Sequence, residues 1–288
     1  NGKDAQDAVT QLRALLKQLP SYEVVQEDES TAQAGYLPRS LRETQLNFIQ
    51  GTRISGGVAI ARPLVVQSLT FEEMLARNPG AKGSPDAEMA LLLSGLEALK
   101  CEKHGALESK TGVEHDIIQA HLSIISDASF QSSITDYIQK NKNAWDAVIV
   151  AAMAFCDILN RSSSKYIKER VLDVLDITTQ LLVAIYGEGA LPENSLELKT
   201  PSIIFAGSLT PSKFLSIDKQ LLAGMVLAST GKTSHTAILA RSLGIPTLTD
   251  IDFYALTLNA QQDLIIDGGP GILSTASAVK VLSYYLNE

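Results

Sequence analysis

The chain has 288 residues with a formal net charge of −8, and 45% of them are hydrophobic and 19% charged. This is the composition of a globular protein large enough for two domains, and its acidic balance argues against a nucleic-acid surface, which requires a basic face. No apolar run approaches the ~20 residues of a membrane span, no signal segment begins the chain, and two distant cysteines favour a reducing cytoplasm over a disulfide framework.

The first predicted element is an amphipathic helix over residues 1–19, followed by a linker over residues 20–47. Apolar residues recur at helical spacing from Ala5 to Leu19, with Asp4 as a candidate N-cap. An acidic run, Gly35 and Pro38 then break the pattern. Because nothing before the helix offers its apolar face a partner, we expect it to be the last helix of a truncated domain.

The remaining pattern predicts an α/β domain that is interrupted by an all-α helical bundle. Residues 48–69 read as two strands around a Ser55-Gly56-Gly57 turn. Within residues 70–186, helical periodicity recurs over 87–107, 117–125, 134–138, 144–159 and 171–185. Within residues 187–288, strands at 202–205, 224–227, 247–248 and 264–266 alternate with helical segments.

One histidine near the end of the chain lies in a pattern suited to holding an anion. The stretch STGKTSHTAILAR at 229–241 follows a strand and enters a helix within a residue or two of His235. The first turn of a helix presents unpaired N–H groups and partial positive charge. A phosphoryl group on this imidazole would meet those groups and the side chains of Lys232, Thr233, Ser234 and Thr236. Neutral imidazole is an adequate nucleophile toward phosphorus.

The same spacing also fits an ordinary histidine at a helix start. Thr233 and Ser234 would then serve only as caps, and glycine, hydroxyl residues and helix starts are each common. The residue pattern alone leaves both interpretations open. No P-loop or G-x-G-x-x-G motif is found, so no nucleotide-binding fold is indicated.

Residues 231–246, GKTSHTAILARSLGIP, resemble the phosphohistidine motif of enzyme I of the phosphoenolpyruvate-dependent sugar phosphotransferase system. Related histidine domains occur in phosphoenolpyruvate synthase and pyruvate phosphate dikinase. Further segments resemble enzyme I in the same order, so that the resemblance covers about residues 50–275: ISGGVAIA at 54–61, IQAHL at 118–122, YIKERVLDV at 166–174 and LTPS, taken as a loop, at 209–212.

The resemblance implies a swivelling phosphohistidine β/α domain in which His235 is phosphorylated on Nε2, and a helical insertion that docks the phosphocarrier HPr. The resemblance also implies that the phosphoryl group is supported by the residues around this histidine, namely Gly231, Lys232, Thr233, Ser234 and Thr236. Three positions depart from the family pattern. Thr230 replaces the first of paired glycines, Lys232 replaces an arginine, and Phe214 stands where a small hydroxyl residue is usual.

Residues 1–19 resemble the final helix of HPr, which would make them the end of an HPr-like domain. That order resembles the phosphotransfer subunit of dihydroxyacetone kinase, in which the phosphoenolpyruvate barrel is absent. The family's magnesium and phosphoenolpyruvate sites belong to the barrel, so we expect no cofactor in this chain. The implied partners are HPr or an HPr-like domain, an IIA-like domain and dihydroxyacetone kinase subunits, with no nucleic acid and no membrane insertion.

The leading hypothesis is a phosphoryl-transfer relay protein that carries phosphate between HPr-type carriers for dihydroxyacetone phosphorylation. One alternative is a truncated general enzyme I for sugar uptake. Another is a non-catalytic module that binds HPr and senses its phosphorylation state. Each of the three predicts affinity for HPr, and only the first two predict covalent transfer.

Four other polar residues are weaker candidates. His104, His115 and His121 have no partners at metal-ligand spacing, so we expect structural or solvent roles and no metal site. His121 alternatively contacts a docked partner, together with its neighbours in the helical hairpin. Arg241 lies six residues after His235, away from its helical face, and is expected to form a structural salt bridge.

Overall fold

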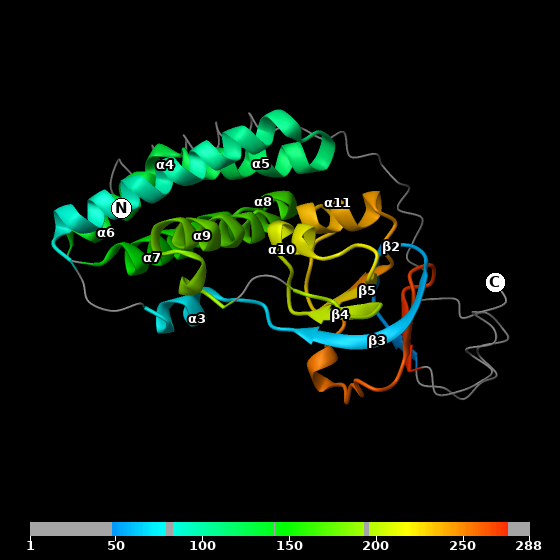
Figure 1. The fold of residues 1–288 in the computed structure, drawn as a ribbon. Coiled ribbons are helices and arrows are strands. Elements are labelled where there is room, and N and C mark those ends of the chain that lie inside the picture. Colours follow the sequence, from blue (N-terminus) through cyan, green and yellow to red (C-terminus); the bar gives the residue numbers. More distant parts are fainter. Residues whose placement is uncertain (1–47, 79–82, 141, 193–195, 276–288) are drawn as a thin grey trace. The chain divides into compact units, whose positions relative to one another are not determined.

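The structure, a computed structural model, describes residues 48–78, 83–140, 142–192 and 196–275. They divide into two compact units (Figure 1). The helical unit takes in the described residues from 69 to 192, and the α/β unit takes in those from 48 to 68 and from 196 to 275. The predicted fold class is confirmed. The helix predicted over residues 1–19 and the linker over 20–47 lie outside the described residues.

In the described part of the helical unit, several helices start at a residue whose side chain caps them. Ser84, Asp127 and Asn143 each accept a hydrogen bond from a first-turn N–H group, which the helix itself cannot pair. The helices are α3 (Phe71–Ala76), α4 (Pro85–Ser109), α5 (Gly112–Ile125), α6 (Ala128–Gln139), α7 (Ala144–Asn160), α8 (Lys165–Glu169) and α9 (Val171–Tyr186), followed by a 3-10 turn, η1 (Glu188–Ala190).

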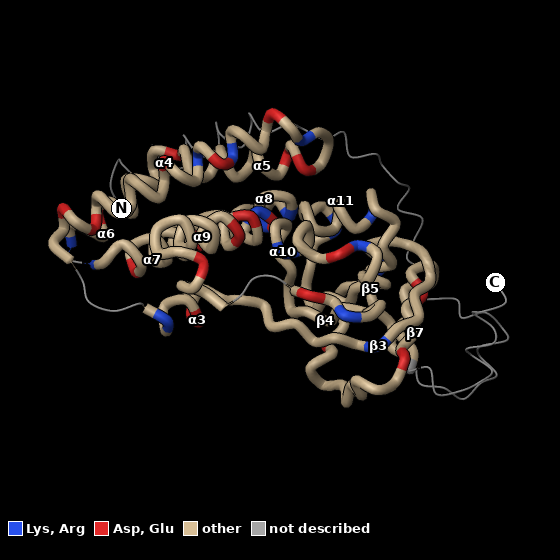
Figure 2. The backbone as a smooth tube through the Cα atoms, viewed as in Figure 1, with Lys and Arg blue, Asp and Glu red and all other residues tan. Residues whose placement is uncertain are grey.

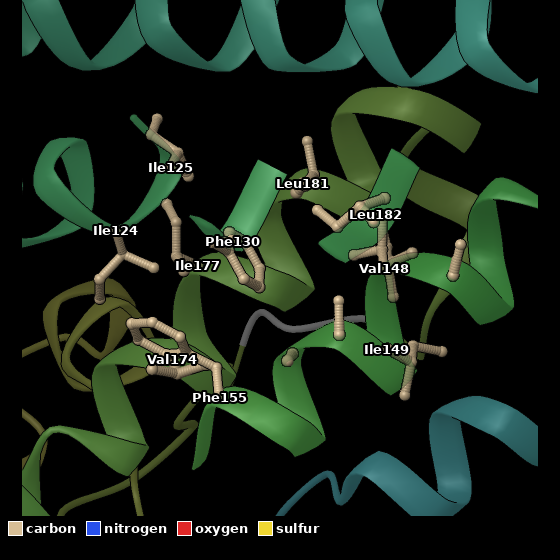
Figure 3. Packing of buried hydrophobic residues seen from close by; sticks show 14 of the residues in the cluster. Ile124, Ile125, Phe130, Val148, Ile149, Phe155, Val174, Ile177, Leu181 and Leu182 are labelled. Atoms are coloured by element: carbon tan, nitrogen blue, oxygen red, sulfur yellow. The ribbon is translucent and has the colours of Figure 1, made fainter. Parts of the chain in front are cut away.

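Helix α7 supplies the centre of this unit's hydrophobic core. Only two of its seventeen residues are charged, and Figure 2 shows it almost without blue or red. Its buried side chains form one cluster with those of α6 and α9, and Figure 3 labels Phe130, Phe155 and Val174 among them. Helix α4 comes close to α9 at Gly95, where a Cβ atom would lie 2.3 Å from Cγ1 of Ile185. Any larger residue there would push the two helices apart.

Two polar side chains of this core, Glu88 and Tyr186, accept hydrogen bonds from backbone N–H groups. The Glu88 carboxylate, 3% exposed, accepts from the N–H groups of Gly83 at 2.6 Å and Ala144 at 2.7 Å. Ala144 begins α7, so the negative charge lies at the positive end of that helix. Trp145 donates its backbone N–H to the Tyr186 hydroxyl at 3.0 Å. Burial and the nearby charge of Glu88 raise the pKa of Tyr186.

The α/β unit is organised around one eight-stranded sheet with the order β1-β8-β7-β3-β4-β5-β6-β2. Strands β3 to β6 run parallel to their neighbours in that series, and the remaining pairings are antiparallel. The strands are β1 (Phe48–Gln50), β2 (Thr52–Ser55), β3 (Val58–Val66), β4 (Ser202–Ala206), β5 (Leu222–Leu227), β6 (Thr247–Thr249), β7 (Leu264–Asp267) and β8 (Ile272–Thr275), with helices α10 (Pro211–Ser216) and α11 (His235–Ser242) and the 3-10 turn η2 (Phe253–Ala255).

The two end strands of the sheet are consecutive in the chain and are joined by Gly51 alone. One extended segment therefore pairs with β8 through β1 and with β6 through β2, which closes the sheet on itself. At the crossing point the Gly51 N–H donates to the Gly271 carbonyl at 2.8 Å. A Cβ atom at Gly51 would lie 2.7 Å from Ile251, so only glycine fits this passage.

Parallel strands bring their carboxyl ends to one edge of the sheet. The segments that follow β3, β4, β5 and β6 therefore meet there, and they include Ser68, Ser208, Thr230 and the strand end Thr249. This edge carries the predicted site, because the segment after β5 leads into α11.

The structure differs from the sequence prediction at several elements. The LTPS segment, expected as a loop, ends in a helix start, since Thr210 caps α10 and Pro211 opens it. The helix expected over 166–174 is interrupted at Arg170, between α8 and α9. Strand β8 and helix α3 were not predicted. Leu191 belongs to the core of the helical unit, so the change of unit falls after the expected residue 187.

Candidate functional site

His235 is the first residue of α11 and is 4% exposed. Ser234 is the N-cap, and its side chain accepts from the Ala237 N–H at 3.2 Å. The cap uses one of the four N–H groups that a helix leaves unpaired at its start. The imidazole thus lies at the positive end of the helix dipole, a position that favours a negatively charged group attached to it.

The segment between β5 and α11 is fastened to the neighbouring strands. The N–H groups of Ala228 and Ser229 donate to the carbonyls of Ala206 and Gly207 at 3.0 and 3.2 Å, which extends the parallel ladder. The Thr230 N–H then donates to Oγ1 of Thr249 at 2.9 Å. Thr230 is 8% exposed and Thr249 is 1% exposed, so this bond replaces water for a buried amide.

Arg241, in the last turn of α11, returns to the same segment. Its Nη2 donates to the Lys232 carbonyl oxygen at 2.6 Å. The structural contact predicted for Arg241 is present. It is a hydrogen bond to a backbone carbonyl, whereas the sequence predicted a salt bridge. Within the turn, the Ser234 N–H donates to the Gly231 carbonyl at 3.3 Å.

The predicted supporting residues are adjacent to His235, and their hydroxyls differ in use. Thr236 is 1% exposed and donates its hydroxyl to the Leu209 carbonyl at 2.7 Å, so its proton is already engaged. Ser234 is committed to the cap. Thr233 and Gly231 are half-buried and Lys232 is exposed. These residues lie near the histidine because they are its neighbours in the chain. Thr249 accepts from the Thr230 N–H and Arg241 donates to the Lys232 carbonyl, and these two bonds hold the backbone of the turn.

Helix α10 packs against α11 and contains Phe214. The side chain of Phe214 is fully buried, and Lys219 lies over its ring at 4.8 Å while donating to the carbonyls at the end of α10. Phe214 is therefore a core residue of the α/β unit. Lys213 donates to the Gln67 carbonyl at 3.3 Å, and burial lowers the pKa of its ammonium group.

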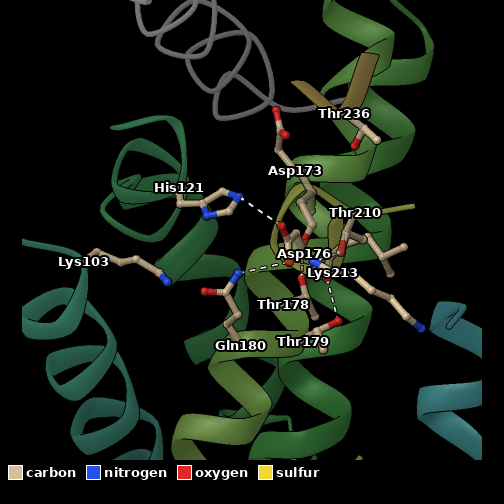
Figure 4. Close-up of polar contacts among 12 residues, drawn as sticks. Lys103, His121, Asp173, Asp176, Thr178, Thr179, Gln180, Thr210, Lys213 and Thr236 are labelled. Carbon is tan, nitrogen blue, oxygen red and sulfur yellow. Dashed lines mark hydrogen bonds and ion pairs between the residues drawn. The ribbon is translucent and has the colours of Figure 1, made fainter. Parts of the chain in front are cut away.

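His121 lies in the helical unit and has different surroundings. Its Nε2 is 3.6 Å from Oδ2 of Asp176, and the two side chains are 1% and 2% exposed (Figure 4). Gln180 donates to the other carboxylate oxygen of Asp176 at 3.0 Å. The pair links α5 to α9 within the bundle, which gives His121 a structural role. A direct contact between His121 and a docked partner stays a prediction.

The other two histidines are less enclosed. His104 is exposed, and His115 lies 3.5 Å from Asp116 on the same helix. Among the described residues, no group of three or more His, Cys, Asp or Glu side chains could hold a metal ion. In the same part of the chain, no helix is both long enough and apolar enough to cross a membrane. Cys101 is exposed, and burial raises the pKa of Cys156 to about 12.

Sequence reasoning missed the residues that fasten the site. Thr249 ends a strand nineteen positions after Thr230, and only the parallel pairing of β5 with β6 brings the two together. In the helical unit, sequence reasoning also missed the partners of His121, since Asp176 and Gln180 lie among the apolar residues of α9. A polar residue in an apolar helical pattern was their only signal in the sequence.

Two family models match the chain. The model described as PEP-utilising enzyme, N-terminal, matches residues 50–170, and the one described as PEP-utilising enzyme, mobile domain, matches residues 198–271. The second match contains His235 and all of α11. A solution NMR structure of Enzyme I (nEIt) covers 83% of this chain and 97% of that chain, with a TM-score of 0.53 at 24% identity, which supports the fold.

Among curated proteins, Multiphosphoryl transfer protein 2 of Escherichia coli (strain K12) is 35% identical over 289 residues, or 100% of this chain and 34% of that protein. The phosphoenolpyruvate-protein phosphotransferase of Mycoplasma genitalium is 27% identical over 247 residues, or 83% of this chain and 42% of that protein. The chain spans about a third of the first of these relatives and less than half of the second. The chain therefore carries an N-terminal domain and a mobile domain of the PEP-utilising enzyme family.

Proposed function

We propose that the α/β unit carries a phosphoryl group covalently on His235 as a relay of the phosphotransferase system. The observation that carries this proposal is the position of His235 as the first residue of a capped helix inside the matched mobile domain. The helix terminus and the turn before it supply positive potential for the phosphoryl oxygens. His235 is buried, and its chain neighbours Ser234 and Thr236 are fixed by their bonds to the Ala237 N–H and the Leu209 carbonyl, so the backbone at the start of α11 is already oriented.

The transfer is a displacement at phosphorus. A lone pair on the imidazole nitrogen, Nε2 by family expectation, forms a new P–N bond. The P–N bond to the donor histidine breaks, and its electron pair returns to the donor imidazole. The acceptor ring gives up the proton on its other nitrogen and the donor ring takes one up. No water and no net proton is therefore consumed, and the group can move in either direction.

The proposed donor or acceptor is HPr or an HPr-like domain that docks on the helical unit. The similarity to multiphosphoryl transfer proteins supports a relay between protein histidines. Dihydroxyacetone phosphorylation is the terminal reaction that we propose for this relay, with a general sugar-uptake enzyme I as the alternative. Reconstitution of the full-length protein separates them, since only the first would restore phosphorylation of dihydroxyacetone by its kinase subunits.

The central test is incubation of the chain with phosphorus-32-labelled phospho-HPr. We expect one acid-labile, alkali-stable label per chain, which is lost in His235→Ala and in the shape-conserving His235→Gln. The matched control is His104→Ala, which removes an exposed histidine from α4. Label that survives both His235 variants would exclude the proposal. Binding of HPr without any label would favour the non-catalytic module.

A further inference from the structure

The turn before His235 is held by two side chains that come from elsewhere in the α/β unit. Thr249 accepts the Thr230 N–H, and Arg241 donates to the Lys232 carbonyl. The first bond lies in the interior, whereas Arg241 and Lys232 are both exposed. Because the bond from Arg241 lies at an exposed position, it does not serve to pair a buried polar group.

The direction of the Lys232 carbonyl matters for an anion on His235. Carbonyl oxygens carry partial negative charge, and one that faced the phosphoryl oxygens would repel them. The C=O and N–H of one peptide unit point in opposite directions, because the peptide is planar and trans. The bond from Arg241 therefore fixes the Lys232 oxygen and, through the same plane, the direction of the Thr233 N–H.

We propose that Arg241 is a positioning residue for phosphoryl transfer, which holds the peptide between Lys232 and Thr233 so that its carbonyl oxygen is turned toward the guanidinium. This inference rests on the proposed function of His235. Arg241 acts through the backbone of the turn. It thereby preserves an electrostatic environment in which the phosphoryl group meets N–H groups and not a carbonyl oxygen.

Because Arg241 and Lys232 are exposed, loss of their hydrogen bond should change phosphoryl transfer without lowering the stability of the fold. Without Arg241, water can solvate the Lys232 carbonyl, so no buried group is left without a partner. The fold would keep its stability while the turn sampled other directions. A purely structural role would instead lower the melting temperature together with the activity.

The test compares Arg241→Ala with Arg62→Ala, which removes an exposed arginine 4.0 Å from Asp263 in the same unit. We expect Arg241→Ala to slow His235 phosphorylation by phospho-HPr about tenfold and to speed hydrolysis of the phosphohistidine. The Thr233 amide resonance and the phosphorus-31 resonance of the phosphohistidine should both shift, with an unchanged melting temperature. Arg62→Ala should match the wild type in every measurement.

A salt series separates positioning from a direct charge effect. Exposed charges are largely screened at about 0.5 M salt, so the difference between wild type and Arg241→Ala should persist there if the backbone direction is its cause. Disappearance of the difference in salt, an unshifted Thr233 amide, or a wild-type rate in Arg241→Ala would each overturn the inference and leave the proposed function intact. Absence of label in the wild type would instead sink the proposed function, and the inference with it.

Discussion

The chain buries one histidine in each unit, and the two differ in what surrounds them. His121 lies within α5, with the carboxylate of Asp176 at 3.6 Å, and Asp176 also accepts from Gln180. His235 opens α11 after its cap, in a turn held by Thr249 and Arg241. The first imidazole is next to a negative charge, whereas the second is at the positive end of a helix.

The charge beside each histidine distinguishes a structural histidine from a phosphoryl carrier, whereas burial does not, because both are buried. An incoming phosphoryl group carries negative charge, which Asp176 would repel and the start of α11 would attract. The imidazole beside a carboxylate is suited to joining two helices. The imidazole at a helix start is suited to carrying an anion. Three substitutions test this contrast, in order of decreasing expected effect.

The strongest test breaks the pair in the helical unit. Asp176→Ala removes the carboxylate from the buried His121 and the half-buried Gln180. Losing one member of a buried pair lowers the free energy of unfolding by about 3–5 kcal/mol. Trp145 is the single tryptophan of the chain and lies in this unit's core, so its fluorescence in urea reports on this unit.

The matched control is Asp157→Ala, which removes an exposed carboxylate from α7 and should change the unfolding free energy by less than about 0.5 kcal/mol. Asp176→Asn keeps an acceptor for Gln180 and should fall between the two. Equal unfolding midpoints for Asp176→Ala and the wild type would show that the pair does not hold α5 to α9.

The second test is in the α/β unit. Thr249→Val removes the acceptor of the Thr230 N–H while keeping the volume of the side chain. A buried amide without a partner lowers the unfolding free energy by about 1–3 kcal/mol, and the released turn should also slow phosphorylation of His235. Amide hydrogen exchange at Thr230 measures the local effect.

Thr249→Ser retains the hydroxyl and serves as the control. It should restore protection of the Thr230 amide and most of the phosphorylation rate. The Trp145 transition should not move in either variant, because the change lies in the other unit. Unchanged Thr230 exchange in Thr249→Val would contradict this account of the turn.

The smallest change in stability is expected at Ser234, the N-cap of α11, where two substitutions should affect stability and phosphorylation differently. Ser234→Ala removes the acceptor for the Ala237 N–H and should lower the unfolding free energy by about 1 kcal/mol. Ser234→Asp still caps the helix but adds a negative charge beside the histidine, so it should retain stability and still slow phosphorylation. The rate of labelling and the thermal midpoint together separate the two effects.

The matched control is Ser84→Asp at the N-cap of α4, where the same charge should leave the rate of labelling unchanged. If Ser234→Asp were phosphorylated as fast as the wild type, the positive potential at the start of α11 would not govern transfer.

Hydrophobic period and turn residues were sufficient to predict the two-part architecture. Helices α4, α5, α6, α7 and α9 follow from local patterns, because each has apolar residues at helical spacing. Strands β4 to β7 follow from short apolar runs between turn residues, and nearly all of their residues are buried. The elements that were missed are short. Helix α10 has six residues and β8 has four, so neither gives a periodic signal, and β8 exists because it pairs with both β7 and β1.

In the candidate site, too, local features could be predicted from the sequence and long-range contacts could not. His235 and its neighbours are contiguous, so a single stretch of sequence was enough to predict them. The roles of Thr249 and Arg241 depend on a strand pairing and on a side chain that folds back over its own helix. The Thr236 hydroxyl, predicted to support phosphate, donates to Leu209, a residue placed nearby by the adjacent strand β4. Local patterns contain no information about such partners.

The closure of the sheet through Gly51 also constrains the order in which the protein can fold during synthesis. Strands β1 and β2 leave the ribosome early, but their partners β8 and β6 are encoded about two hundred residues later. The helical unit lies between these strands in the sequence and has its own core. It can therefore fold before β1 and β2 have partners to pair with. We expect the α/β unit to be the late and slow step of translation-coupled folding, since its contacts are the least local in the chain.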